Sequence, residues 1–232
     1  MDAWSIGLLV LVVAGLAAVV FGALHDRARH RRRTTEMLAP PARAIPRFAP
    51  DAPSPQYLSE LQTRRPPATA APALGATERA EVERLLRDDA AVAVRAGYAS
   101  AAFVTEPGAG WAVLEEPVVL VCADEVASLR ELLGLLERVV LSHRALVLVA
   151  PAVARDVLST LEVNQIQRKL SLVVVLAPDG ALLEQVARGC GSRLTERGDR
   201  QAGYLPGDDL GACRRWVSTA RESRLVPAVP GS

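Results

Sequence analysis

The chain has 232 residues, of which 50% are hydrophobic, and a formal net charge of +1 at pH 7. This near-neutral charge argues against a nucleic-acid partner, because phosphate binding needs a basic surplus on the folded part. Cys122, Cys190 and Cys213 are an odd set without CxxC spacing, so they indicate reduced thiols in a cytosolic setting and neither a disulfide framework nor a zinc site.

The N-terminus is the most apolar part of the chain. Trp4–Leu24 is an uncharged run that, as a helix, would span about 30 Å, the thickness of a bilayer core. A signal peptide is the alternative, but such peptides carry positive charge before the apolar region, whereas Asp2 precedes this one. The basic cluster HDRARHRRR follows it. The positive-inside rule therefore predicts a single-pass cell-membrane anchor over residues 1–33, helical at about 4–24, with the N-terminus outside and the globular domain cytoplasmic.

A Pro- and Ala-rich stretch over residues 34–76 follows the basic cluster. Proline removes backbone donors and fixes φ, so this stretch is predicted to be a disordered, extended linker. It contains one apolar island, SPQYLSELQ at residues 54–62. Two interpretations of the island stay open, namely a single helical turn that serves as a docking motif and a linker with chance apolar residues.

Residues 77–219 alternate helical and strand patterns, which predicts an α/β domain containing parallel strands. A helix opens at Thr77, with acidic residues in its first turn, and ends near Gly97. Further on, strands are expected at Ala101–Val104, Trp111–Leu114 and Pro117–Cys122. A helix is expected at Val126–Leu141. The apolar face of that helix comprises Leu129, Leu132, Leu133, Leu136, Val139 and Val140, whereas Leu135 and Leu141 fall outside it.

The centre of the domain is a strand–helix–strand pattern. Ala145–Ala150 and Leu172–Ala177 are predicted to be buried strands, and a helix over 153–168, opened by Pro151, lies between them. Its core stripe comprises Val153, Ala154, Val157, Leu158 and Leu161, while Val163 and Ile166 point away from the stripe. A helix at Ala181–Cys190, a closing strand at Arg215–Ser218 and a flexible tail over 220–232 complete the expected elements.

Several segments of this domain together resemble one known family. They are GYASAAFV at 97–104, EEPVVLV at 115–121, SLRELLGLLERVV at 128–140, TLEVNQIQRKLSLVVVLAP at 160–178 and LPGDDLGACRRWV at 205–217. In this order they resemble the apical domain of group I chaperonins, the GroEL type, over roughly residues 95–218. The resemblance implies a β-sandwich flanked by helices, two of which line an apolar groove for non-native polypeptide. It also implies that ATP hydrolysis belongs to a different domain of those proteins.

The resemblance assigns groove positions to particular residues of this chain. They are Tyr98, Phe103, Leu133, Leu136, Leu158, Val163 and Asn164. Two positions depart from the family, since Ala102 replaces an aromatic residue and Glu162 replaces an aliphatic one. A carboxylate buried against an apolar ligand is costly, so the groove would prefer a basic ligand, bind more weakly or not bind. Glu162 therefore joins the candidate peptide-binding residues, and so does Ile166, without an assigned role.

The sequence contains no recognisable catalytic set. His25 and His30 lie in the basic cluster and His143 in a predicted turn, while the glycines at 108–110 lack the Lys and Ser/Thr of a phosphate-binding loop. We therefore expect no enzyme activity, cofactor, metal or nucleotide. The expected function is a membrane-tethered, ATP-independent module that binds polypeptide segments or a partner protein in the groove. The alternative is a structural scaffold or assembly domain of a membrane complex, and a third interpretation places the domain outside the membrane.

Overall fold

The computed structural model describes residues 4, 15–17, 19–29, 60–67, 73–88, 91–203 and 205–228. The chain divides into two units, Met1–Tyr57 and Leu58–Ser232. In the first unit, residues 15–17 and 19–29 are helical. Among the residues described, no helix is long and apolar enough to cross a membrane. The other residues of 4–24, and the linker residues 34–59 and 68–72, lie outside the described part of the chain.

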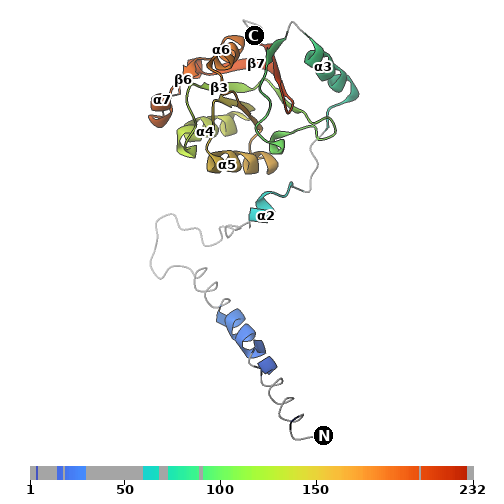
Figure 1. Cartoon of the computed structure of the whole chain (residues 1–232), viewed down its shortest axis with the longest axis vertical. Helices are drawn as coiled ribbons and strands as arrows, with labels where there is room; N and C mark the ends of the chain where they lie inside the picture. Colours follow the sequence, from blue (N-terminus) through green and yellow to red (C-terminus); the bar gives the residue numbers. More distant parts are fainter. Residues whose placement is uncertain are drawn as a thin grey trace. The chain divides into compact units, whose positions relative to one another are not determined.

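The second unit contains short helices and strands in mixed order (Figure 1). The α-helices are α2 Glu60–Thr63, α3 Ala76–Arg87, α4 Leu133–Ser142, α5 Arg155–Ile166, α6 Gly180–Cys190 and α7 Arg197–Gln201. The 3₁₀ turns are η1 Ala101–Phe103, η2 Leu129–Leu132 and η3 Gly207–Asp209. The strands are β1 Val92–Val94, β2 Ala112–Glu115, β3 Val118–Cys122, β4 Leu146–Ala150, β5 Leu172–Leu176, β6 Leu194–Thr195, β7 Gly211–Ser218 and β8 Ser223–Pro227.

The strands form two halves that share β7. One half has the parallel strands β3, β4 and β5 in chain order, with β6 also parallel to β3. The other half is antiparallel, in which β8 lies between β1 and β7, and β2 also pairs with β7. The first residues of β7 pair antiparallel with β3 and so join the halves. The predicted α/β class is confirmed, and a shared strand connects the two sheets that the expected sandwich kept separate.

The parallel strands are apolar throughout because helices cover them. Every residue of β3 and β4 is buried, as the continuous Val- and Leu-rich runs predict. Since α4 and α5 each connect neighbouring parallel strands in one direction, right-handed crossovers place both helices on the same side. Figure 1 shows α4 and α5 on one side of β3 and α6 on the other. The two helices predicted to form the groove therefore share one side of the sheet.

The helix expected at Val126–Leu141 differs from its prediction in start and in phase. Val126 forms a bridge to Val153, η2 follows, and the α-helix begins only at Leu133. Leu135, expected off the apolar face, is 1% exposed, whereas Leu133 and Val140, expected on it, are 47% and 46% exposed. The physical reason is that a 3₁₀ turn advances by a third of a turn per residue, so one α-helical period cannot span both segments.

Three other predictions are wrong in extent or type, and some short elements were not predicted. The helix from Thr77 ends at Arg87, and the following Val92–Val94 forms β1. Ala101–Val104 was expected as a strand, but Ser100 caps a 3₁₀ turn there by accepting from the amide of Ala102. The expected tail contains β8, and the short elements β6, α7 and η3 have no counterpart in the prediction. Pairing with distant strands decides β1 and β8, and such pairing leaves little local signal.

Candidate functional site

The outer face of α5 is defined by Ser159, Glu162, Val163 and Ile166. Their spacing of three and four residues places them on one side of the helix. On the opposite side, Val157 and Leu161 are each 1% exposed and belong to the core. Val163 and Ile166 are half-buried and belong to neither hydrophobic cluster of the described residues. Helix α5 thus turns apolar side chains away from the core, as the stripe analysis predicts.

A segment that precedes the domain, residues 60–67, lies across this face. Arg64 donates from Nη1 to Glu162 Oε2 at 3.1 Å and from Nη2 to Ser159 Oγ at 2.8 Å. Gln167, just after α5, donates from Nε2 to the backbone carbonyls of Thr63 and Arg65, at 2.7 and 2.9 Å. Of the two interpretations of the apolar island left open by the sequence, a helical turn is present at its end, as α2 Glu60–Thr63. The outer face of α5 therefore already binds a piece of polypeptide.

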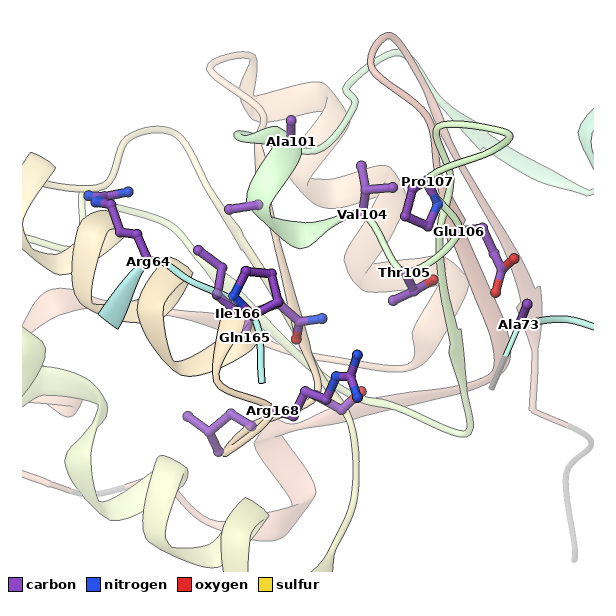
Figure 2. Close-up of a pocket in the computed structure, with 14 residues that line it drawn as sticks. Arg64, Ala73, Ala101, Val104, Thr105, Glu106, Pro107, Gln165, Ile166 and Arg168 are labelled. Atoms are coloured by element: carbon purple, nitrogen blue, oxygen red, sulfur yellow. The ribbon is translucent and has the colours of Figure 1, made fainter. Parts of the chain in front are cut away.

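Two cavities flank this segment. The larger, about 790 Å³, lies between α5 and η1 with the loop after it. Figure 2 shows Ile166 from α5 in this cavity, with Ala101 and Val104 from the η1 side and Arg64 from the preceding segment. Its lining is mostly apolar: Pro66, Ala73, Ala101, Ala102, Val104, Pro107, Ile166 and Leu170. Small side chains on η1, those of Ala101 and Ala102, thus line open space.

The smaller cavity, about 680 Å³, is more polar. It is lined by Arg64, Arg155, Asp156, Leu158, Ser159 and Glu162. Arg64 lines both cavities, so the side chain that contacts Glu162 also stands between the two spaces. The smaller cavity is therefore lined mainly by polar and charged groups, whereas the larger one is mostly apolar but also includes Arg64, Glu106 and Arg168.

The structure separates the predicted groove residues into accessible and buried ones. Phe103 is fully buried in η1 and Leu136 is 9% exposed, so both belong to the core in this conformation. Tyr98 is half-buried, packs on the core and forms a bridge with Val175. Leu133 is exposed on α4, away from the cavities just described.

The residues predicted on α5 mostly reach the surface. Leu158 and Glu162 line the smaller cavity, and Ile166 lines the larger one. Asn164 is different, because its Nδ2 donates to the carbonyl of Thr160 within the same helix at 2.8 Å. Its own backbone carbonyl accepts from the amides of Lys169 and Leu170 after the helix, so Asn164 organises the helix end.

The cavities described on α4 and on α5 have separate linings. The cavity on α4, about 450 Å³, is lined by α4 residues together with Val118, Arg144 and Leu210, without α5 residues. The cavities on α5 involve η1 and the segment 60–67 in place of α4. The apolar surface therefore lies between α5 and η1, because η1 packs directly against α5.

The sequence interpretation missed Arg64, Ser159 and Gln167 as parts of this surface. The one signal in the sequence was Glu162, for which a ligand with a basic group was one of three open alternatives, beside weaker binding and no binding. A basic group does lie against Glu162, and it is the chain's own Arg64. Within the described residues, no three His, Cys, Asp or Glu side chains are grouped so that they could hold a metal ion.

Comparison with known proteins bears on part of the chain. Over 82 residues, the sequence is 43% identical to Chaperonin GroEL 1 of Mycobacterium ulcerans (strain Agy99). This region of the chain is chaperonin-like. The match covers 35% of this chain and 15% of that protein, so it spans a minor part of the curated relative. No protein-family model matches the chain.

Two solved structures give weaker similarity. One is the open-state monomer of a group II chaperonin from Methanococcoides burtonii, with a TM-score of 0.42 and 12% identity over 60% of this chain and 31% of that one. The other is the chaperonin gp146 from bacteriophage EL of Pseudomonas aeruginosa, with a TM-score of 0.45 and 15% identity over 60% of this chain and 28% of that one. At these TM-scores the two alignments carry no weight for function.

Proposed function

We propose that this chain is a chaperone-type polypeptide-binding module whose binding surface is the outer face of α5 together with η1. The observation that carries the proposal is a polypeptide segment, residues 60–67, held on that face beside an apolar cavity of about 790 Å³. The 43% identity to a chaperonin over 82 residues supports a role of this type.

The surface offers three kinds of contact to a polypeptide. Val163 and Ile166, with the alanines of η1, bury apolar side chains of the client, and each 100 Å² removed from water stabilises the complex by roughly 2.5 kcal/mol before ordering costs. Gln167 donates to backbone carbonyls, a contact that any sequence can accept. Glu162 accepts from a basic side chain. Binding by these contacts requires no covalent step and no ATP, so the proposed activity is neither enzymatic nor nucleotide-driven.

The test is suppression of aggregation of a chemically denatured client by the full chain. Replacing Val163 and Ile166 by glutamate should abolish suppression, because two carboxylates would replace the apolar contacts. Leu133→Glu is the matched control, since it makes the same change at an exposed site on α4. Equal suppression by all three proteins would exclude α5 as the surface. Circular dichroism should show unchanged secondary structure in each variant.

One observation favours a second function, the scaffold. Helix α4 exposes the side chains of Leu133, Val140 and Leu141, and Leu141 is 81% exposed. A fixed partner that covers them would remove this apolar surface from water. A wild-type chain that suppresses no aggregation, while Leu133→Glu disrupts an assembly isolated with the chain, would support the scaffold over the polypeptide binder.

A further inference from the structure

Residues 60–67 occupy the proposed polypeptide site on α5 in this structure. We propose that this segment is a built-in ligand, so that the α5 surface selects arginine-bearing polypeptides and binds one in cis until a client displaces it. The inference rests on the proposed function, since it names the ligand class and the competitor of that same site.

The contacts of the segment are those expected of a ligand. Arg64 makes charge-assisted hydrogen bonds to Glu162 and Ser159, two neighbours on the outer face. Gln167 holds the backbone on both sides of Arg64, at Thr63 and Arg65. The contacts of Gln167 bind the peptide by its main chain. The contacts of Glu162 and Ser159 select one side chain within it. The specified residue is arginine.

The cavities are consistent with displacement. Arg64 lines both the 790 Å³ and the 680 Å³ cavity, and Pro66 lines the larger one. When the segment leaves, the apolar space beside Ile166 and the polar space beside Glu162 become continuous. A client segment with an arginine at Glu162 and an apolar residue several positions away would occupy both spaces at once.

The contact between Arg64 and Glu162 is weak enough for a client to displace the segment. The Arg64 side chain is 41% exposed and that of Glu162 is 14% exposed, and partly exposed ion pairs of this kind are weak. Only residues 68–75 separate the segment from α3, so its effective concentration at α5 is high. A weak contact at high effective concentration keeps the site covered and still lets a better ligand replace it.

The test uses the full chain and a fluorescent peptide that carries residues 58–67, LSELQTRRPP, added in trans. In the full-length variant Arg64→Glu, the cis contact becomes repulsive, so the surface is free and the peptide should bind about five- to tenfold tighter than to wild type. Arg65→Glu is the matched control, because it makes the same charge change at the next residue, whose side chain is exposed and whose backbone carbonyl accepts from Gln167. This variant should bind the peptide like wild type.

The reciprocal variant, Glu162→Arg, tests whether Glu162 is the residue that selects arginine. Glu162→Arg in the full chain should lose the peptide and instead bind a peptide in which glutamate replaces Arg64. If Arg64→Glu and Arg65→Glu bind the peptide alike, or if Glu162→Arg keeps its preference for arginine, the inference is overturned.

The aggregation assay separates this inference from the proposed function. If wild type suppresses aggregation and Arg64→Glu brings no gain in peptide binding, the cis ligand is excluded while the polypeptide site stands. If Arg64→Glu gains peptide binding and no variant suppresses aggregation, the cis ligand stands while the chaperone-type role is excluded.

Discussion

At the scale of single residues, the three thiols show what burial does to chemistry. Cys122 ends β3, Cys190 ends α6 and Cys213 lies in β7, and all three are buried and free. Desolvation raises the pKa of Cys122 to about 12, of Cys190 to about 11 and of Cys213 to about 12. A thiol that stays protonated is a poor nucleophile and a poor metal ligand, so these cysteines serve as small apolar side chains.

The raised thiol pKa values predict how stability depends on pH. In the unfolded chain these thiols ionise at an ordinary pKa of 9.0, and in the folded chain only near 11 to 12. Their contribution to stability is therefore fully present below about pH 9 and is lost as pH rises from there toward 12. Urea unfolding at increasing pH should show this decline. In a separate experiment at neutral pH, a maleimide reagent should label the unfolded chain and leave the folded chain unlabelled. Labelling of the folded chain would contradict the burial of the three thiols.

At the scale of elements, a buried ion pair connects η2 to α7. Arg200 is 0% exposed and donates from Nε to Glu131 Oε2 at 3.1 Å, while its Nη1 donates to the carbonyl of Thr195 at 2.7 Å. Its Nη2 donates to the carbonyl of Glu125 at 2.9 Å, in the loop after β3. One guanidinium, from α7, thus ties η2, β6 and this loop together just before α4 begins.

Removal of this guanidinium should be costly. Arg200→Ala leaves the Glu131 carboxylate buried without its main partner, so we expect a loss of about 3–5 kcal/mol in the free energy of unfolding. Arg197 is the matched control, because it pairs with the same carboxylate from an exposed position. Its Nε lies 3.8 Å from Glu131 Oε1, and its side chain is 51% exposed. Arg197→Ala should cost less than about 1 kcal/mol. Equal losses in chemical denaturation would show that the buried contacts of Arg200 do not hold η2 and α7 together.

At the scale of the whole molecule, the chain combines a folded unit with an N-terminal unit that exposes apolar side chains. Leu16, Val19, Val20, Phe21 and Leu24 are between 51% and 72% exposed on the helical residues described there. An apolar helix surface of this kind needs a partner, and the uncharged run in the sequence favours lipid. We therefore retain the membrane tether as a proposal, with the folded unit on the cytoplasmic side.

Fractionation of cells tests the tether. The full chain should sediment with membranes and resist an alkaline carbonate wash, whereas Leu16→Arg combined with Val20→Arg should release it, because each arginine in a membrane helix costs about 2.5–3.5 kcal/mol. Leu133→Arg, on α4 in the other unit, should leave the chain in the membrane fraction. A wild-type chain in the soluble fraction would rule out the tether. A tag after Ser232 should be protected from external protease if the folded unit is cytoplasmic.

The sequence by itself determined the elements whose signal is local. The apolar runs of β3, β4 and β5 are strands because a strand buried on both faces needs no alternation. The stripe on α5 predicted which residues face the core, and Val157 and Leu161 do so. The departure of Glu162 from an aliphatic residue left three outcomes open from the sequence, namely a basic ligand, weaker binding or no binding, and the structure places Arg64 against it.

Only the tertiary structure decided which distant segments meet. The 3₁₀ turn that precedes α4 contains Glu131, whose ion-pair partner Arg200 lies 69 positions away along the chain. Strand β8 exists because β1 and β7 offer it edges on both sides. Arg64 reaches Glu162 across 98 positions. Periodicity records which way a side chain points from its own element, but the choice of a remote partner depends on packing free energies that no local pattern contains.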